Sequence, residues 1–224
     1  AITKISNIHF AVTKYAMNRI IRMGENKKFV FNFGSPGIDE IKNNQITNRL
    51  KLEKKYGITF TGEEVLLVYH PVTTESKDSE KQIKIIMDAI LKTKKRIIAI
   101  GPNSDAGNNE IFNCLKLFSK KFNSINMFTS IPRADYLGML KNCGLLIGNS
   151  SSGIIEANYF NLPVVNIGIR QKDRDRGKNI IDVLEISKIS ILNGIKKAIL
   201  LKQRKKLTNE KIYGNGNASK NIVN

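Results

Sequence analysis

The residues best suited to chemistry gather in one short stretch, IGNSSSGIIEA at residues 147–157. An apolar run ends there, three serines lie between two glycines, and a helix-like run that carries Glu156 follows. If a helix begins at these serines, its unpaired N–H groups and the hydroxyls of Ser150 and Ser151 face one point at the positive end of the helix dipole, which suits a phosphate. The alternative is a serine N-cap followed by a surface glutamate. The residues alone leave both interpretations open.

Glu156 adds a second group to this stretch. It follows Ser151 by about five residues, and therefore lies about 7 Å further along a helix. A carboxylate accepts two hydroxyl hydrogen bonds, whereas it would repel a second phosphate. The spacing therefore suits a ribose diol next to a diphosphate.

Four further candidates lie at or near the ends of other apolar runs. His70 follows EVLLVY, Asn103 lies in the loop GPNSDAG, Arg170 follows PVVNIG, and Tyr136 opens the helix-like run after IPRAD. Arg170 could bind an anion with two parallel hydrogen bonds, and Tyr136 could stack on a nucleobase. Each also has a structural interpretation, because a lone histidine is often structural, asparagine is a common turn residue, and a tyrosine can simply pack.

The elements that position these residues alternate regularly between residues 63 and 205. Short apolar runs are each followed by turn residues and then by a longer amphipathic stretch, which is typical of βαβ units on a parallel sheet buried on both faces. We therefore predict an α/β, Rossmann-like domain, in which ligands bind at the carboxyl ends of the strands. The predicted strands are EVLLVY (64–69), RIIAI (96–100), SINMFTS, GLLIG and PVVNIG.

The rest of the chain divides around this domain. Residues 1–45 show the same pattern but offer only two strands and two helices, and we interpret them as the remnant of an N-terminal Rossmann-like domain. Residues 46–62 are the predicted linker, 63–205 the nucleotide-binding domain, and 206–224 a C-terminal tail. Because the chain opens with AITKISNIHF, we expect it to be a fragment.

Composition narrows the class of protein. Of the 224 residues, 41% are hydrophobic and 25% charged, which excludes disordered and collagen-like classes, and no apolar run approaches the roughly 18 residues of a membrane span. The two cysteines lie in apolar segments without metal-ligand spacing, so we expect buried thiols in the cytoplasm, with no metal and no cofactor. The net charge of +18 favours a nucleic-acid partner, but the basic residues are scattered, so we expect a solvated surface.

Taken together, these motifs resemble the UDP-N-acetylglucosamine 2-epimerase family, most closely its hydrolysing members that begin the biosynthesis of sialic-acid-type sugars. The resemblance runs along nearly the whole chain and is most specific in GNSSSGIIEA and NIGIRQ. It also covers the segments AITKISNIHF, FGSPGIDEI, VYHPVT, GPNSDAG and IYGNGNA. It implies a GT-B fold, with two Rossmann-like domains facing each other across a nucleotide-sugar cleft and the C-terminal tail packing back on the first domain.

The resemblance also implies a role for each candidate. Ser150 and Ser151 would bind the diphosphate, Glu156 the ribose hydroxyls and Tyr136 the region of the uracil ring. Asn103 and Arg170 would line the same nucleotide pocket. His70, the expected catalytic residue of this chain, would face the diphosphate and the reacting sugar.

The implied reaction eliminates UDP from UDP-N-acetylglucosamine and adds water to give N-acetylmannosamine. The family takes its acid and base groups mainly from carboxylates of the first domain, which is mostly missing here. We therefore expect this chain to bind UDP weakly and to be inactive alone, and the full-length protein to form a homodimer. The alternatives are a GT-B glycosyltransferase, a basic nucleic-acid-binding protein, and a split-gene product that needs a partner chain.

Overall fold

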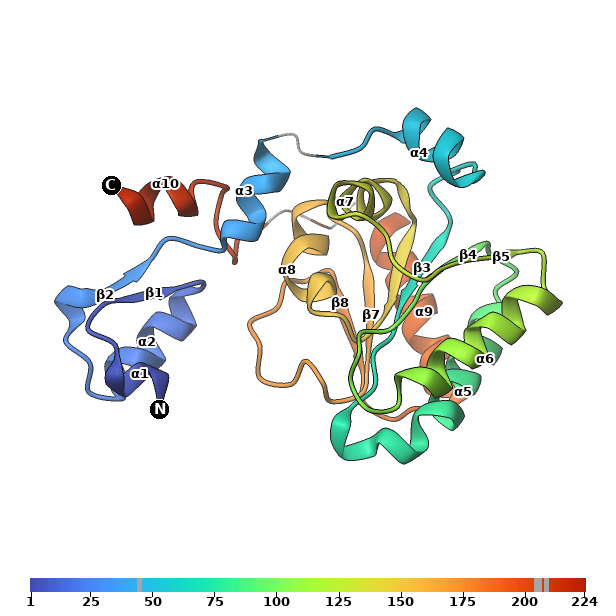
Figure 1. The fold of residues 1–224 in the computed structure, drawn as a ribbon, viewed down its shortest axis with the longest axis horizontal. Coiled ribbons are helices and arrows are strands. Elements are labelled where there is room, and N and C mark those ends of the chain that lie inside the picture. Colours follow the sequence, from blue (N-terminus) through green and yellow to red (C-terminus); the bar gives the residue numbers. More distant parts are fainter. Residues whose placement is uncertain (44–45, 204–206, 208–209) are drawn as a thin grey trace.

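The computed structural model describes residues 1–43, 46–203, 207 and 210–224. Its main body is a six-stranded parallel sheet with the strand order β5-β4-β3-β6-β7-β8 (Figure 1). The strands are β3 (Val65–Val68), β4 (Ile97–Ile100), β5 (Ile125–Phe128), β6 (Leu145–Gly148), β7 (Val164–Ile167) and β8 (Ile180–Val183). The five predicted strands are present, and β8 is an addition, because the sequence analysis assigned no strand to it. The α/β prediction with a Rossmann-like parallel sheet is confirmed.

Helices cover both faces of this sheet, which explains the near-continuous apolar strands. Alternate strand residues face opposite layers: Leu67 packs in one core and Leu66 in the other. One face is covered by α5 (Ser79–Leu91), α6 (Asn108–Lys121) and α9 (Lys188–Gln203), and the other by α7 (Arg133–Asn142) and α8 (Ser151–Tyr159) (Figure 1). We call residues 63–203 the six-stranded domain.

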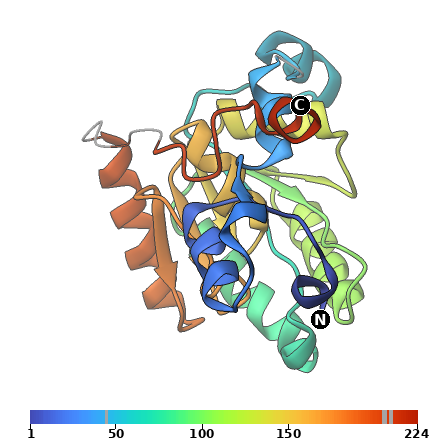
Figure 2. The same ribbon diagram turned by 90° about the vertical axis from the view of Figure 1, so that its left-hand side faces the viewer.

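A small second unit, the first lobe, comprises residues 1–32. It contains α1 (Ile2–Ile5), β1 (His9–Ala11), α2 (Lys14–Arg22), the short 3-10 helix η1 (Lys27–Phe29) and β2 (Val30–Asn32). Its two strands pair in parallel, and α2 crosses between them on the side of the buried residues His9, Ala11 and Val30. The lobe lies to one side of the six-stranded domain (Figures 1 and 2).

The predicted linker, residues 46–62, holds a packed helix, α4 (Arg49–Tyr56). Leu52 of this helix is fully buried, and α4 packs against α7. The carboxylate of Asp135 accepts hydrogen bonds from Thr47, Lys55 and Tyr56. The segment is therefore fixed to the six-stranded domain. The predicted boundaries at 45/46 and 205/206 fall on or next to residues outside the described part of the chain.

The C-terminal segment lies against the segment that follows the first lobe. Helix α10 (Ala218–Val223) packs on α3 (Pro36–Lys42), and the Asp39 carboxylate accepts the backbone N–H groups of Ala218 (3.0 Å) and Ser219 (2.7 Å). In Figure 1, α10 lies above the first lobe, and α3 lies between α10 and the six-stranded domain. Over the described residues, no helix has both the length and the apolar character needed to cross a bilayer.

Candidate functional site

The strand order places a switch point between β3 and β6. From β3 the chain turns to α5 on one face of the sheet, and from β6 it turns to α8 on the other. A crevice at the carboxyl ends of the strands is the usual ligand site of such sheets. His70 follows β3 and the serine turn, residues 149–152, follows β6, so both lie at this switch point. Asn103 follows β4 and Arg170 follows β7, one strand further out on each side.

The serine turn begins helix α8 as the sequence predicts. Ser150 is the N-cap residue, and its Oγ accepts the N–H of Ser152 at 3.4 Å. This cap satisfies one of the four N–H groups that a helix leaves unpaired at its start. The cap and the anion site are therefore compatible. Ser150 and Ser151 are both half-buried at the helix end.

Close contact between β3 and β6 fixes the position of this turn. Gly148 has φ +138°, and a Cβ there would lie 1.9 Å from the carbonyl oxygen of Val68. Only glycine fits so near the neighbouring backbone. The glycine before the serines therefore lets the two strand ends run side by side up to the ligand edge.

His70 is held as a neutral ring. Its Nδ1 accepts the backbone N–H of Asn103 at 3.0 Å, so the ring proton lies on Nε2. Burial, together with the nearby positive charge of Arg170, lowers the pKa of His70 to about 4, while Asp105 acts in the opposite direction. At neutral pH the ring can therefore donate one hydrogen bond from Nε2 without carrying a charge.

Glu156 is buried and only half satisfied. Its Oε1 accepts from Nη2 of Arg133 at 2.7 Å, and Arg133 also pairs with Glu40 of α3 at 2.9 Å. The sequence analysis did not single out Arg133, because its partners lie far away in the chain. The ion pairs connect α8, α7 and α3 at this point.

Three acceptors at this edge have no hydrogen-bond partner. Within the described residues, the buried side-chain polar atoms without one are Oδ1 of Asn103, Oε2 of Glu156, Oε1 of Gln171 and Oγ of Ser79. An unpaired buried acceptor is costly and calls for an explanation. Acceptors need donors, so hydroxyl or amide N–H groups are the kind of ligand group that could pair with such oxygens.

Arg170 and Gln171 both point to the serine turn. Nη1 of Arg170 donates to the carbonyl oxygen of Asn149 at 3.3 Å, and Nε2 of Gln171 donates to the same oxygen at 2.8 Å. The structure thus brings His70, Asn103, Ser150, Ser151 and Arg170 to one edge, with Glu156 one helical turn away.

Tyr136 is held in place by packing and by one hydrogen bond. Its hydroxyl hydrogen-bonds Ser152 Oγ, its ring packs against the core on the α7 and α8 side, and burial raises the pKa of its phenol. Packing accounts for this side chain, and contact with a nucleobase stays a prediction.

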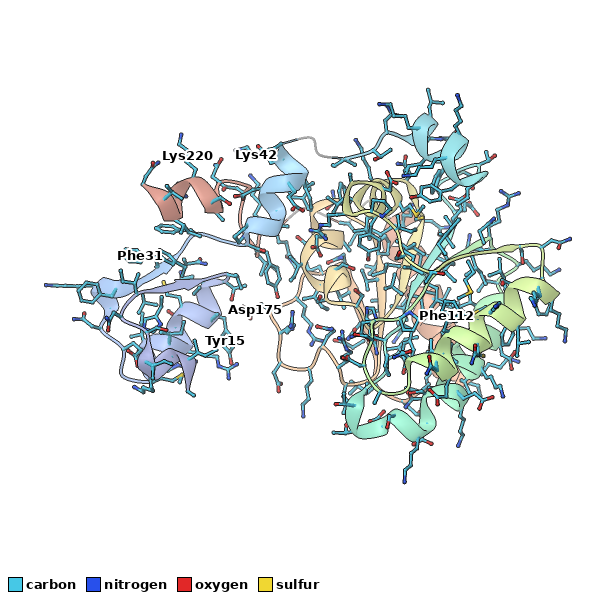
Figure 3. The ribbon with its side chains drawn as sticks, viewed as in Figure 1. Tyr15, Phe31, Lys42, Phe112, Asp175 and Lys220 are labelled. Carbon is cyan, nitrogen blue, oxygen red and sulfur yellow. The ribbon has the colours of Figure 1, made fainter. Side chains whose placement is uncertain are left out.

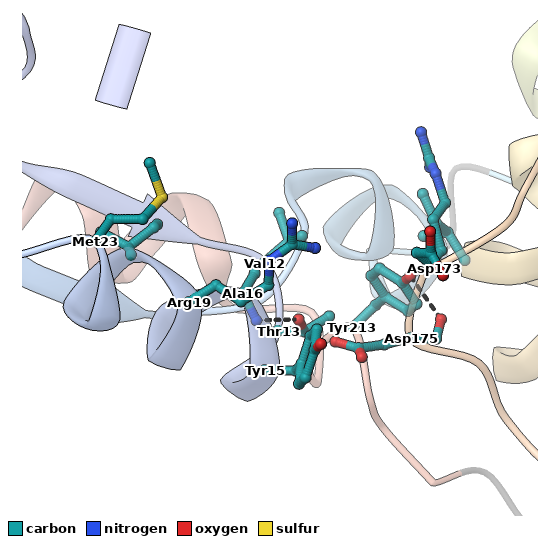
Figure 4. A pocket seen from close by; sticks show the side chains of 12 residues that line it. Val12, Thr13, Tyr15, Ala16, Arg19, Met23, Asp173, Asp175 and Tyr213 are labelled. Atoms are coloured by element: carbon teal, nitrogen blue, oxygen red, sulfur yellow. Dashed lines mark hydrogen bonds between the residues drawn. The ribbon is translucent and has the colours of Figure 1, made fainter. Parts of the chain in front are cut away.

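A cavity of about 440 Å³ lies between the first lobe and the six-stranded domain (Figure 4). The lobe contributes Val12 and Thr13, which follow β1, together with residues of α2, and the domain contributes Ile155 and the loop at Asp173–Asp175. Ile155 is four residues after Ser151, so both lie on one face of α8. Tyr15 and Asp175 lie on facing sides of this space (Figure 3), and the Tyr213 hydroxyl donates to the carbonyl of Asp175 at 2.8 Å. Helix α8 therefore reaches this cavity through Ile155, while the serine turn itself is not among the residues that line it.

A parallel sheet with this strand order, and a helix N-terminus at its switch point, defines a Rossmann-like nucleotide-binding domain of the GT-B type. The chain is a member of the UDP-N-acetylglucosamine 2-epimerase family, whose model matches residues 1–224.

Two curated relatives extend this finding. A Legionella pneumophila protein named "UDP-N,N'-diacetylbacillosamine 2-epimerase (hydrolyzing)" is 36% identical over 219 residues, which are 98% of this chain and 57% of the relative. An Escherichia coli "Polysialic acid biosynthesis protein P7" is 38% identical over 198 residues, covering 87% of this chain and 50% of the relative. The chain thus spans about half the length of the curated relatives it matches.

Solved structures share the fold. A UDP-GlcNAc 2-epimerase from Neisseria meningitidis, bound to UDP-GlcNAc, superposes with a TM-score of 0.80 at 17% identity, covering 99% of this chain and 61% of that one. The Methanocaldococcus jannaschii UDP-GlcNAc 2-epimerase, in complex with UDP-GlcNAc and UDP, gives 0.76 at 20% identity, covering 98% and 60%. At these identities the likeness establishes the fold alone.

Proposed function

We propose that this chain is the UDP-binding part of a hydrolysing UDP-N-acetylglucosamine 2-epimerase. The observation that carries the proposal is the serine turn, which starts α8 at the switch point of the sheet beside a neutral histidine and an arginine. The family match supports the assignment, as do a relative named as a UDP-sugar 2-epimerase and a related structure bound to UDP-GlcNAc.

The diphosphate would take the N–H groups of the first turn of α8 and the hydroxyls of Ser150 and Ser151. Arg170 would supply positive charge from the next strand end. The ribose hydroxyls would donate to the unpaired Oε2 of Glu156, while Asn103 would line the nucleotide pocket. Nε2 of His70 would donate to an oxygen of the departing diphosphate without adding charge.

The reaction proceeds in two steps in this proposal. UDP leaves from C1 as a proton is removed from C2, which gives a glycal-type intermediate. Water then adds its hydroxyl to C1 and a proton returns to C2 on the opposite face, which yields N-acetylmannosamine. His70 can assist UDP departure, but proton transfer at C2 needs a group poised as a base. Among the described carboxylates of the first lobe, Glu25 is paired with Lys4 and His9. We therefore propose that the chain binds UDP and does not turn over substrate alone.

Titration calorimetry with UDP tests the binding step. We expect wild-type protein to bind UDP, and Ser151→Ala and Arg170→Ala each to weaken binding by roughly tenfold, because each removes a hydrogen bond to a charged group. Ser187→Ala is the control for loss of a serine hydroxyl at a helix start where no nucleotide is proposed to bind; Ser187 Oγ accepts the N–H of Ser190 at the beginning of α9. Absence of UDP binding by the wild-type chain would refute the proposal.

A product assay tests the second part. Incubation with UDP-GlcNAc should give no free N-acetylmannosamine by NMR, and UDP-N,N'-diacetylbacillosamine should likewise remain intact. Product formation by this chain would overturn its predicted inactivity. A sugar transferred to an added acceptor would instead favour the glycosyltransferase alternative. We retain the homodimer of the full-length protein and its cytoplasmic location as expectations.

A further inference from the structure

Asn149, the first residue of the serine turn, connects two strand ends through its side chain. It is 0% exposed. Its Oδ1 accepts the backbone N–H of His70 at 2.8 Å, and its Nδ2 donates to the carbonyl oxygen of the same residue at 2.8 Å. The two bonds continue the β3–β6 pairing beyond Val68 and Gly148, where the strands end.

The backbone of Asn149 connects a third strand end. Its carbonyl oxygen accepts from Arg170 at 3.3 Å and from Gln171 at 2.8 Å, and both of these residues follow β7. One fully buried residue therefore fixes the backbone of His70, the guanidinium of Arg170 and the start of α8 relative to one another.

We propose that Asn149 is the positioning residue of this site: it holds His70 and Arg170 in register with the first turn of α8 and has no surface left for contact with the nucleotide. The inference rests on the proposed UDP site. Asparagine suits the role because one planar group must present an acceptor and a donor to the N–H and C=O of one residue. Aspartate lacks the donor, and glutamine is one methylene longer.

The alternative is that Asn149 only ties β3 to β6 and contributes to folding. Asn179 provides a matched control for this. It is 2% exposed, its Nδ2 donates to the carbonyl of Leu162 at 2.9 Å, and its Oδ1 accepts from Asn158 at 3.1 Å. It precedes β8, so its hydrogen bonds lie at the amino edge of the sheet, away from the ligand edge.

The first experiment compares N149D with N179D in UDP titrations well below both melting temperatures. Each substitution sets a buried carboxylate against a carbonyl oxygen, so both variants should melt earlier. Only N149D should lose UDP affinity, by roughly tenfold to a hundredfold, because it replaces the side chain that holds the His70 backbone, while the carbonyl that accepts from Arg170 is kept. Equal UDP affinities for N149D, N179D and wild type would overturn the inference.

Lowering the pH from 8 to 5.5 sharpens the comparison. Burial raises the pKa of the introduced carboxyl group above its value in the unfolded chain. Its protonated form can donate a hydrogen bond to the carbonyl oxygen of His70. This form is favoured at low pH and is lost as the pH rises. N149D should therefore recover UDP affinity on acidification. The charged and titratable groups facing this point are His70, Arg170 and Asp105. The pKa of His70 is about 4 in wild type, below this range. N149S, which shares any change in His70 but adds no carboxyl, is the control for the recovery.

The second readout is the titration of His70 by NMR, which is simple because the chain has only two histidines. In wild type and N179D its pKa should stay near 4, whereas in N149D or N149S it should rise toward the usual value because the ring is no longer held in place. N149S replaces N149D if the latter does not fold. If wild type binds no UDP, the proposed function fails while this titration still decides the role of Asn149. An unchanged His70 titration in N149D and N149S would overturn the proposed positioning role of Asn149.

Discussion

The six-stranded domain and the first lobe are both built from parallel strands and helices, but their strands are buried to very different extents. In β3 all four residues are buried, with helices on both faces of the sheet. In the first lobe, α2 covers one face only. On the other face Phe10, Phe31 and Phe33 stack on one another at 5.4–5.8 Å, and Phe10 and Phe31 remain 43% and 36% exposed.

This difference has a physical consequence for stability. Parallel sheets are normally covered on both faces, and a two-stranded pair is marginal by itself. We therefore expect the folding free energy to come mainly from the six-stranded domain, which also supplies the serine turn, His70 and Arg170. The first lobe would then depend on contacts made by α3, α10 and the walls of the cavity between the two units.

The largest expected effect is on the stability of the domain. Leu66→Ala removes a side chain that is 0% exposed, and should lower the free energy of unfolding by about 2–5 kcal/mol. Phe31→Ala in the first lobe should cost less, about 1–2 kcal/mol, because Phe31 is already 36% exposed. Urea unfolding measures both. A larger loss for Phe31→Ala than for Leu66→Ala would contradict the comparison.

The next effect concerns the ligand that the domain is proposed to bind. Glu156→Gln replaces the unpaired carboxylate oxygen and should weaken UDP binding by roughly tenfold, since a hydrogen bond to a charged group is lost. Binding of inorganic pyrophosphate, which has no ribose, should not change. Glu110→Gln, at an exposed position of α6, is the control. Equal losses for UDP and pyrophosphate would remove Glu156 from ribose recognition.

Burial also decides which elements could be predicted from the sequence. The five predicted strands are mainly apolar runs, interrupted only by Asn126 in β5 and Asn166 in β7. Strand β8 was missed because IIDV is short and lies between charged residues, and α4 was missed because RLKLEKKY buries only Leu52. Local pattern therefore predicts elements whose apolar residues stand out from their neighbours in the sequence.

In the candidate site, local groups could be predicted from the sequence, whereas pairs between distant residues could not. Ser150, Ser151 and Glu156 belong to one helix start, so their geometry follows from adjacent residues. Asn149 stood inside the quoted motif, yet its partner His70 is 79 residues away, and Arg133 reaches Glu40 across 93 residues. Such pairs depend on the tertiary fold and leave no local signal.

A third prediction concerns the anchor of α10. Burial would raise the pKa of Asp39, but the N–H groups of Ser219 and Ala218 outweigh it and hold that pKa below its usual range. A carboxyl group whose pKa is lower in the folded than in the unfolded protein stabilises the fold at pH values above its unfolded pKa, which is near 4. This stabilisation is lost as the pH falls through the pKa of the folded state. The α10 amides should therefore exchange faster below that range. Asp39→Asn should cost about 0.5–2 kcal/mol of local stability at pH 7, as a lost helix cap does.

The smallest effect is expected at the ion pairs that join α3 to the domain, beside the apolar contacts of Ile38 and Ile41. Arg133 pairs with Glu40 and Glu156, but it is 42% exposed, so Arg133→Ala should change the free energy of unfolding by less than about 1 kcal/mol. UDP affinity is the sharper measurement, because removal of the arginine leaves the Glu156 carboxylate buried without its cation. Arg133→Lys keeps the charge but loses the shared geometry, so its UDP affinity should lie between wild type and Arg133→Ala. If Arg133→Ala destabilised the protein as much as Leu66→Ala, the ion pairs and not the apolar core would hold these elements together, and the division of stability between the two units would have to be redrawn.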